Sequence, residues 1–493
     1  MTIKFFFQKL LSGYFYFVGL VVFFVLHRWN EVFDFLSFWE VSKILFSLTI
    51  LILIYFFAGK VIFRNKNKSA LFTLLSFSLF LFFSFVEVCS AFLGKAGVHV
   101  STKLFLAGLL FLLFFVILFL KKERVRGSVY LNALFLVLVF FEITQLMWKG
   151  VSKKELQNEL MMEVSKTDSL RPKPSVYLIL LDEYAGAESL EKYYGFDNRL
   201  FIGQLEDLGF VVAKKAFGNY DYTVLSIASM LNGEYLKFPS KESVYSNENY
   251  TNALNAIYQN KTFRTFKKLG YKTVNYSPFQ IEGSESEYSN SYLPAKSLLL
   301  LHPTVFDEII ELLPFYIARK MKEKKWLANM FKEKIATNYR LIEKVVNESS
   351  KSDSIPSFYY MHLMMPHAPF AVDSSGNINM SFLGASSMNT ETKRQAYFQY
   401  LIHTNKVILS FISKLRKNTK GEAVIILTSD HGSRDLMTAD DTESGFNSIN
   451  ALYYPGKDSL IYDGITNVNQ FRILFSAITN KRIPLLKDSI VVK

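Results

Sequence analysis

The chain has one cysteine among its 493 residues, Cys89, and this residue lies within a long apolar run. The residues beyond that run therefore form no disulfide, and a domain of their length can bury a sufficient core without one. The sequence also shows no internal repeat, no extended low-complexity tract and no nucleic-acid-binding motif. Its net charge of +13 is therefore more typical of contact with an anionic membrane surface than of nucleic-acid binding.

The hydrophobic residues, 50% of the chain, are concentrated in its first third. They form runs long enough to cross a bilayer, for which about 20 residues suffice. We predict five spans, at about Leu10–Leu26, Ile44–Phe63, Ala70–Cys89, Leu104–Leu120 and Val129–Met147. A cleaved signal peptide is not expected, because the first run lacks a small-residue cleavage site and further runs follow. Any single run could be a buried core helix, but five in series favour a membrane domain over residues 1–148.

Basic residues predict the orientation of these spans. Two clusters follow the second and fourth spans: Lys60, Arg64, Lys66 and Lys68, then Lys121, Lys122, Arg124 and Arg126. The positive-inside rule places both clusters, and the amino terminus with them, in the cytoplasm. Five spans then place everything after Trp148 outside the cytoplasm.

The residues after the spans have a different pattern. A polar linker over 149–173 ends at Pro172 and Pro174, and from 174 to 493 short apolar runs alternate with amphipathic segments. The runs are Val176–Leu181, Gly209–Ala213, Tyr271–Tyr276, Phe358–Leu363, Ala423–Leu427 and Ile449–Tyr454. The helical periods include Glu188–Leu208, Lys261–Leu269 and Thr392–Leu415. This alternation predicts an α/β domain with a mainly parallel sheet between layers of helices.

Two of the predicted strands end in acidic residues. Asp430 and His431 follow the run Ala423–Leu427, and Asp182 and Glu183 follow the first strand. A carboxylate and an imidazole at the carboxyl end of a buried strand can bind one metal ion, although a polar strand end is the simpler alternative. Neighbouring side chains in a strand point in opposite directions, so Asp182 and Glu183 can both bind only if the chain bends there.

Three further residues could contribute to chemistry at this edge of the sheet. Thr223 precedes a helical period and is expected at the helix N-cap, where it is either a simple cap or a hydroxyl nucleophile beside a phosphate site. His367 lies between Pro366 and Pro369 in a rigid loop after a strand, which makes it a site candidate. His362 lies inside the strand itself, so core and site roles are both open.

Other features have alternative interpretations. The basic-aromatic stretch within 302–350, which includes Lys322, Lys324 and Lys325, is either a helix on the membrane surface or a solvated helical face. Glu87 and Glu142 lie near the outer ends of their spans, where intramembrane acids are functional candidates and interfacial solvation is the alternative.

These motifs together resemble the alkaline phosphatase and sulfatase superfamily, in particular its membrane-bound phosphotransferases, lipoteichoic acid synthase and the phosphoethanolamine transferases. The matching motifs are Asp182 at a strand end, the nucleophile helix TVLSIASMLNG, the Pro366–Phe370 loop, and Ser-Asp-His-Gly at 429–432. They occur in family order across about residues 174–480. The resemblance implies an alkaline-phosphatase-like fold and a metal shell of Asp182, Thr223, Asp430 and His431, with Glu183 as an additional acid beside Asp182.

The resemblance also implies a function. The expected reaction is transfer of a phospholipid head-group phosphoryl unit, of the phosphoethanolamine or glycerophosphate type, through a phosphothreonine to a lipid or glycan acceptor. One Mn²⁺ or Zn²⁺ ion is expected, and His367 and His362 would neutralise phosphate charge or protonate a leaving oxygen. The chain departs from these relatives in having Asp where they usually have Glu, no His after His431 and no disulfide, which leaves a second metal and the head group open.

Alternative functions follow from the same motifs. Sulfatases of this fold have a motif similar to Cys-x-Pro-x-Arg or Ser-x-Pro-x-Arg at the nucleophile, the signature for conversion to formylglycine. This chain instead has Thr223, with Leu225 in place of the Pro and Ile227 in place of the Arg, and threonine cannot form that aldehyde. A membrane-anchored phosphodiesterase or phosphatase that uses water is the main alternative. A scaffold with a decayed site is a further alternative, but Asp182, Thr223, Asp430 and His431 argue against it.

Overall fold

The structure is a computed structural model that forms two compact units, each described here by itself. The first contains Met1–Lys154 and Leu293–Lys322, and the second contains Glu155–Tyr292 and Glu323–Lys493. The residues that the structure describes are 11, 13–31, 36, 38–95, 97, 100–120, 125–151, 160–165, 173–237, 247–287, 300–301, 304–306, 309, 324–351, 355–368, 370, 372–379, 389–437, 442–457 and 460–492.

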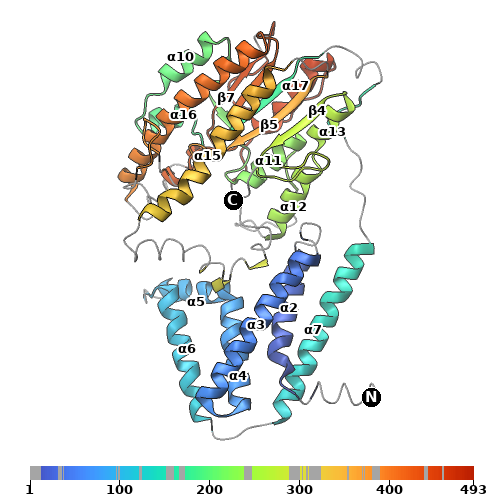
Figure 1. The fold of residues 1–493 in the computed structure, drawn as a ribbon, viewed down its shortest axis with the longest axis vertical. Helices are drawn as coiled ribbons and strands as arrows, with labels where there is room; N and C mark the ends of the chain where they lie inside the picture. The colour runs from blue at the N-terminus through green and yellow to red at the C-terminus, as the bar shows by residue number, and fades with distance from the viewer. Residues whose placement is uncertain are drawn as a thin grey trace. The chain divides into compact units, whose positions relative to one another are not determined.

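The first unit is helical (Figure 1). Its helices are α2 (Phe15–Glu31), α3 (Phe38–Phe63), α4 (Lys66–Leu81), α5 (Phe83–Lys95), α6 (Thr102–Phe119) and α7 (Val125–Val151). In the described part of the chain, three helices are long and apolar enough to cross a membrane: Phe38–Phe63, Thr102–Phe119 and Ser128–Val151. This confirms an N-terminal group of apolar membrane-type helices, while the count of five spans and the orientation stay predictions.

The predicted third span, Ala70–Cys89, is not one straight helix. The pair α4 and α5 is bent by 75° between Leu81 and Phe83, so it forms a broken span or a re-entrant segment. The amino end of α4 is fixed by Asn65, whose side chain accepts hydrogen bonds from the backbone N–H groups of Asn67 and Lys68. Because both halves are apolar, hydropathy alone does not reveal the bend.

A short segment from beyond residue 290 belongs to the helical unit. Leu300 and Leu301 are buried in the same apolar cluster as residues of α2, α3 and α4. The ring of Phe306 lies 5.7 Å from that of Phe77. This differs from the predicted division, which assigned all of 174–493 to the catalytic domain. Most of the basic-aromatic stretch, including Lys322, lies outside the described residues, and so do the side chains of Lys324 and Lys325.

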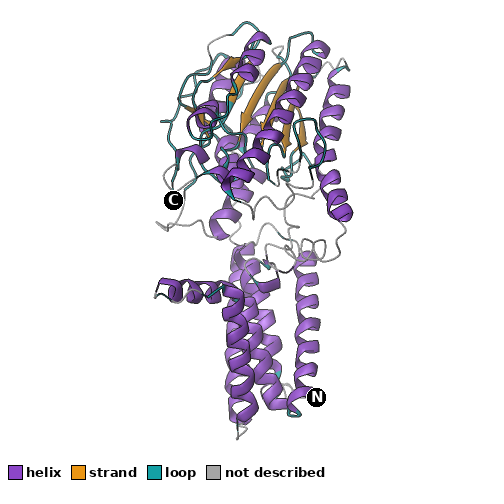
Figure 2. Cartoon of the chain, turned by 90° about the vertical axis from the view of Figure 1, so that its left-hand side faces the viewer, coloured by secondary structure: helices purple, strands orange, loops and turns teal. Residues whose placement is uncertain are grey.

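The second unit is built on a six-stranded sheet, which Figure 2 shows between helices. Its strand order is β2-β7-β6-β1-β5-β4. The strands are β1 (Val176–Leu181), β2 (Val211–Val212), β4 (Lys272–Tyr276), β5 (Ser357–Leu363), β6 (Val424–Ser429) and β7 (Asn450–Tyr453). Strands β4, β5, β1 and β6 are parallel, while β7 is antiparallel to β6 and to β2. The predicted mainly parallel α/β fold is confirmed, and the central strands β1, β5 and β6 are buried throughout.

Helices cover both faces of this sheet. They are α9 (Ala187–Lys192), α10 (Arg199–Asp207), α11 (Thr223–Asn232), α12 (Asn247–Tyr258), α13 (Lys261–Lys268), α15 (Lys324–Ser349), α16 (Thr390–Asn418) and α17 (Gln470–Thr479). Alternate residues of β5 face opposite layers: Tyr359 belongs to the apolar cluster that includes residues of α10, α15 and α16. Its neighbour Phe358 contacts the rings of Phe266 in α13 and Phe471 in α17. This alternation is the reason that the strand is apolar along its whole length.

Two details of the second unit differ from the predicted pattern. The helical period Glu188–Leu208 is two helices, α9 and α10, because Gly195 between them adopts a φ of 71°. A two-stranded sheet of β3 (Ala216–Phe217) and β8 (Ile465–Thr466) was not predicted, since two residues are too short for a recognisable pattern.

Candidate metal and catalytic site

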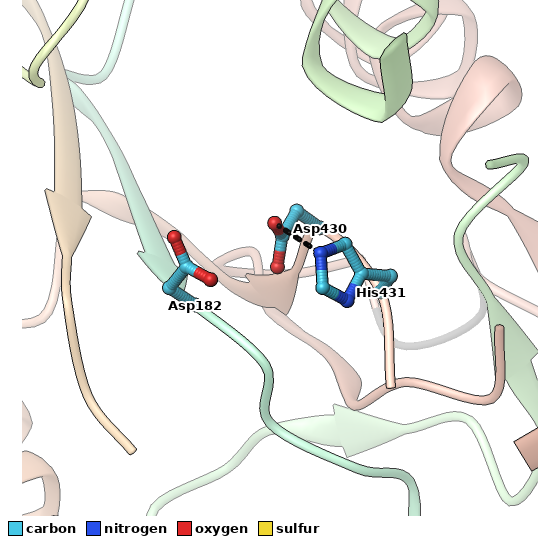
Figure 3. A group of neighbouring side chains, drawn as sticks. All are labelled: Asp182, Asp430 and His431. Carbon is cyan, nitrogen blue, oxygen red and sulfur yellow. Dashed lines mark ion pairs between the residues drawn. The ribbon is translucent and has the colours of Figure 1, made fainter. Parts of the chain in front are cut away.

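Adjacent parallel strands bring the predicted acids together. In the pairing of β1 with β6, Leu181 lies opposite Ser429, so Asp182 and Asp430 both follow the carboxyl ends of neighbouring strands. Figure 3 shows their carboxylates and the His431 ring converging from the two strand ends. One ligand atom from each of Asp182, Asp430 and His431 lies within 4.8 Å of the others, and all three residues are buried.

The donor atoms of this cluster suit a cation. Within the described residues, Asp182 Oδ1 and Asp430 Oδ2 are buried and accept no hydrogen bond. The other oxygen of each carboxylate does accept hydrogen bonds, but leaving one buried carboxylate oxygen of each pair without a donor is costly unless a positive charge lies beside it. The His431 Nδ1–H group donates to the Gly432 carbonyl oxygen at 2.7 Å, which leaves the Nε2 lone pair for a ligand, 3.1 Å from Asp430 Oδ2.

Thr223 is the first residue of α11 and lies beside this cluster. Its Oγ1 is 3.2 Å from His431 Nε2, and its side chain is partly exposed. The N-cap of the helix is Tyr222 rather than Thr223, so the expected N-cap position of Thr223 is wrong by one residue. The helix is held against the site by Ser226, whose hydroxyl donates to the Asp430 carbonyl oxygen at 2.6 Å.

Glu183 occupies a sharp bend of the chain. Its φ is +59°, an unusual value for a residue other than glycine, and its N–H donates to Asp430 Oδ1 at 3.2 Å. A bend at this position is what the sequence analysis required if Asp182 and Glu183 were to bind one metal ion together. The Glu183 carboxylate, however, is outside the metal-type cluster of the described residues, and its Oε1 lies 3.5 Å from Arg434 Nε.

Arg434 is a site residue that the sequence interpretation missed. Its guanidinium lies 4.8 Å from the centre of the Tyr222 ring, next to Thr223 in the chain. Burial lowers the pKa of Arg434, but the carboxylates of Glu183, Asp430 and Asp182 raise it above its ordinary value. A signal was present in the sequence, because an arginine three residues after His431 emerges at the same sheet edge.

The two predicted histidines also lie beside Asp182. His362 is fully buried, and its Nε2 is 2.9 Å from Asp182 Oδ2. His367 Nε2 is 3.9 Å from Asp182 Oδ1, while its Nδ1–H donates to the Ala368 carbonyl oxygen at 2.6 Å. The structure therefore brings both histidines to the predicted site.

Electrostatics couples these groups. Burial lowers the pKa of His367, but Asp182 and Glu183 outweigh it and raise the pKa to about 9. Burial raises the pKa of Asp182, but His367 and His362 outweigh it and hold that pKa below its ordinary value. In the metal-free protein these shifts favour a protonated His367 beside an ionised Asp182 at neutral pH.

The chain is similar to a known protein family and, at low sequence identity, to several solved structures. A model of the sulfatase family matches residues 183–462. No curated protein is significantly similar to the chain. Among solved structures, the zinc complex of the C-terminal periplasmic domain of EptC from Escherichia coli is similar at 12% identity, over 63% of this chain and 83% of that one, with a TM-score of 0.38. The phosphonate monoester hydrolase of Agrobacterium radiobacter is similar at 11% identity, over 62% and 74%, with a TM-score of 0.37.

Proposed function

Because the chain belongs to the sulfatase family, we propose that it is a metal-dependent phosphotransferase that acts on phospholipids at a membrane surface. It transfers the phosphoryl-linked head group, of the phosphoethanolamine or glycerophosphate type, to a hydroxyl of a lipid or glycan. The observation that carries this proposal is the Thr223 hydroxyl, 3.2 Å from His431 Nε2, beside the buried Asp182–Asp430–His431 cluster. We place the reaction on the extracytoplasmic face of a bacterial-type cytoplasmic (inner) membrane, in a multi-pass protein.

The metal would be held by Asp182, Asp430 and His431, with the Thr223 hydroxyl beside them and Glu183 as a further candidate ligand. When bound, a Mn²⁺ or Zn²⁺ ion supplies Lewis acidity that lowers the pKa of an adjacent hydroxyl and polarises a phosphate oxygen. The unpartnered Asp182 Oδ1 and Asp430 Oδ2 are the atoms that favour a cation here.

Thr223 is positioned to attack phosphorus. It opens α11, a helix of 10 residues, so the free N–H groups of the first turn and the positive end of the helix favour a phosphate group there. The deprotonated Thr223 oxygen forms a bond to phosphorus as the bond to the diacylglycerol oxygen breaks, and that oxygen takes the proton of His367. An acceptor hydroxyl then attacks the phosphothreonine, its proton passes back to His367, and Thr223 leaves as the alkoxide.

Positive side chains complete the proposed mechanism. His367, whose pKa is raised to about 9 by Asp182 and Glu183 in the metal-free protein, is the group placed to give a proton to the departing diacylglycerol oxygen. His362 holds Asp182 in place through its Nε2. Arg434, fixed by the Tyr222 ring and by Glu183, stabilises negative charge that develops on the phosphoryl oxygens.

The test is mass spectrometry of Thr223 after incubation with metal and phosphatidylethanolamine or phosphatidylglycerol labelled in the head group. We expect a labelled phosphothreonine that disappears when an acceptor is supplied, and label in the acceptor rather than in a water-soluble product. Thr223→Ala should abolish turnover, while Thr223→Ser, which keeps a hydroxyl, should retain part of it. An unmodified Thr223 together with full activity of Thr223→Ala would falsify the proposal, and release of the label to water would instead identify a phosphodiesterase.

A further inference from the structure

A polar cluster lies inside the helical unit, between α2 and α7. The two helices pack side by side and run in the same direction, since Gly19 meets Phe135 and, further along, His27 meets Glu142. We call the following residues the α2–α7 cluster: His27, Arg28, Asn30, Glu31, Glu142 and Lys149. Glu142 is only 3% exposed, although it belongs to the apolar stretch Ser128–Val151 that can cross a membrane. A buried carboxylate at such a position is costly, which favours a function for it.

Hydrogen bonds fix the arrangement of the cluster. Glu142 Oε1 is 2.9 Å from His27 Nδ1, and Glu142 Oε2 accepts a bond from the Asn30 amide at 2.6 Å. Because Nδ1–H donates to the carboxylate, His27 Nε2 is left as an acceptor, and it lies 3.9 Å from Glu31 Oε1. The His27 side chain is 45% exposed, so this nitrogen and the neighbouring Glu31 carboxylate can be reached from the surface of the helical unit.

The cationic part of the cluster adjoins a pocket. Lys149 Nζ donates to the Asn30 carbonyl oxygen at 2.5 Å, and among the described residues no carboxylate forms an ion pair with Lys149. Lys149 also lines an open pocket of about 400 Å³ on the surface of α7, together with Thr144, Gln145 and Trp148 of the same helix. An ammonium, an amide and a hydroxyl beside an indole ring fit the phosphate and the interfacial region of a lipid.

From this geometry we infer that the α2–α7 cluster and its pocket bind the head group of a zwitterionic phospholipid, the phosphate at Lys149 and the ammonium at His27 Nε2 and Glu31. Asn30 joins the two sites, because its carbonyl oxygen contacts Lys149 and its amide contacts Glu142. Glu142 is a positioning residue: it keeps the ring proton of His27 on Nδ1, so that Nε2 can accept a hydrogen bond from the ammonium. This inference deepens the proposed function, since it names an ammonium-bearing phospholipid as the lipid that the helical unit holds.

Charge balance favours a zwitterion over an anionic lipid. The cluster contains two cations, Arg28 and Lys149, and two carboxylates, Glu31 and Glu142, and Arg28 already pairs with Glu31. A head group that carries both a phosphate and an ammonium leaves this balance unchanged, whereas an anionic head group adds an uncompensated negative charge in a region of low dielectric constant. We therefore expect the site to distinguish phospholipids by their head groups rather than by their acyl chains.

The experiment uses the full chain carrying Thr223→Ala, so that lipid binding is measured without turnover. The protein is incubated with equal amounts of phosphatidylethanolamine and phosphatidylglycerol that share their acyl chains, and bound lipid is counted by native mass spectrometry. We expect phosphatidylethanolamine to be preferred. His27→Leu and Glu142→Gln should lower the ratio of the two bound lipids about tenfold, the effect of losing one charge-assisted hydrogen bond.

Matched controls separate this site from general lipid association. Lys149→Gln should reduce binding of both lipids, while Lys43→Gln and Glu87→Gln, which alter exposed residues of other helices, should leave the ratio and the amount unchanged. His27 is half exposed, so His27→Leu tests the site even if Glu142→Gln destabilises the helices. An unchanged lipid ratio in His27→Leu overturns the inference. A changed ratio together with an unmodified Thr223 in the wild-type chain rejects the proposed reaction and leaves the lipid site standing.

Discussion

At the residue scale, the predictions that depend on strand ends agree with the observed geometry. Asp182, Asp430 and His431 are close together because parallel neighbouring strands end at one edge of a sheet, and this consequence can be read from the sequence. The sequence also places Arg434 at this edge, three residues after His431, but its contact with Glu183 could not be read from the sequence. Glu183 has a positive φ, and backbone bends of this kind leave no periodic signal. The same bend explains why Glu183 faces Arg434 rather than the cluster of Asp182.

His367 provides a pH prediction for the metal-free protein. Its pKa of about 9 lies above the ordinary histidine value, so its protonated ring stabilises the fold fully below about pH 6.5, and this contribution is lost as the pH rises through 9. In the presence of a chelator, the melting temperature of the wild-type protein should therefore fall between pH 6.5 and 9.5 by several degrees more than that of His367→Gln.

A second histidine supplies the control for this measurement. Burial lowers the pKa of His403, and its Nε2 lies 2.6 Å from the Tyr339 hydroxyl, far in sequence from the site. Its titration lies below the tested range, so His403→Gln should keep the wild-type slope between pH 6.5 and 9.5. Equal slopes for wild type and His367→Gln would show that Asp182 and Glu183 do not hold the proton on His367.

At the element scale, the six strands of the main sheet could be predicted because each lies within a short, largely apolar run, and the central strands β1, β5 and β6 are buried throughout. The helical segments between the runs predicted a mainly parallel sheet, but they did not indicate that β7 is antiparallel to β6 and β2. The breaks within apolar or amphipathic segments could not be predicted from the sequence. The bend between α4 and α5 and the division of α9 from α10 depend on local backbone geometry and tertiary packing, whereas hydrophobic periodicity reports only which side chains are apolar.

Gly218, just after β3, provides a test of how closely the elements approach at the site. A Cβ atom at this position would lie 2.1 Å from the carbonyl oxygen of Asp430, so the backbone of the metal-type cluster would have to move. We expect Gly218→Ala to reduce the free energy of unfolding by about 1–3 kcal/mol, the usual cost of overpacking, and to weaken metal binding. Urea denaturation and metal titration by calorimetry measure both effects.

A glycine of α10 serves as the matched control. A Cβ atom at Gly203 meets no atom within 4 Å, so Gly203→Ala should raise the free energy of unfolding by about 0.4–1 kcal/mol through the loss of chain freedom in the unfolded state. Metal affinity should not change in this variant. If Gly218→Ala bound metal with wild-type affinity, the proposed link between the β3 loop and Asp430 would be wrong.

At the scale of the whole molecule, the chain is not divided into two successive parts. Leu300 and Leu301 come from the middle of the sequence after the first α/β strands, yet they are buried among α2, α3 and α4. The sequence could not indicate this, because an apolar run of a few residues is typical of a strand or a core turn as much as of a membrane contact. The chain therefore passes between the two units three times, after Lys154, after Tyr292 and after Lys322.

This arrangement predicts how the α/β unit behaves when the first helices are removed. A chain of residues 155–493 retains the strands and the Asp182–Asp430–His431 cluster, but it exposes Leu300, Leu301 and Phe306, whose partners are missing. An exposed apolar segment of this kind promotes association, so we expect the truncated protein to self-associate without detergent. Replacing all three residues by serine should shift it toward monomer in size-exclusion chromatography with light scattering. Leu200→Ser, at a residue that is 77% exposed in α10, should not have this effect.

In the full chain, the triple replacement should instead lower stability, because it places hydroxyl groups in the apolar cluster of the helical unit.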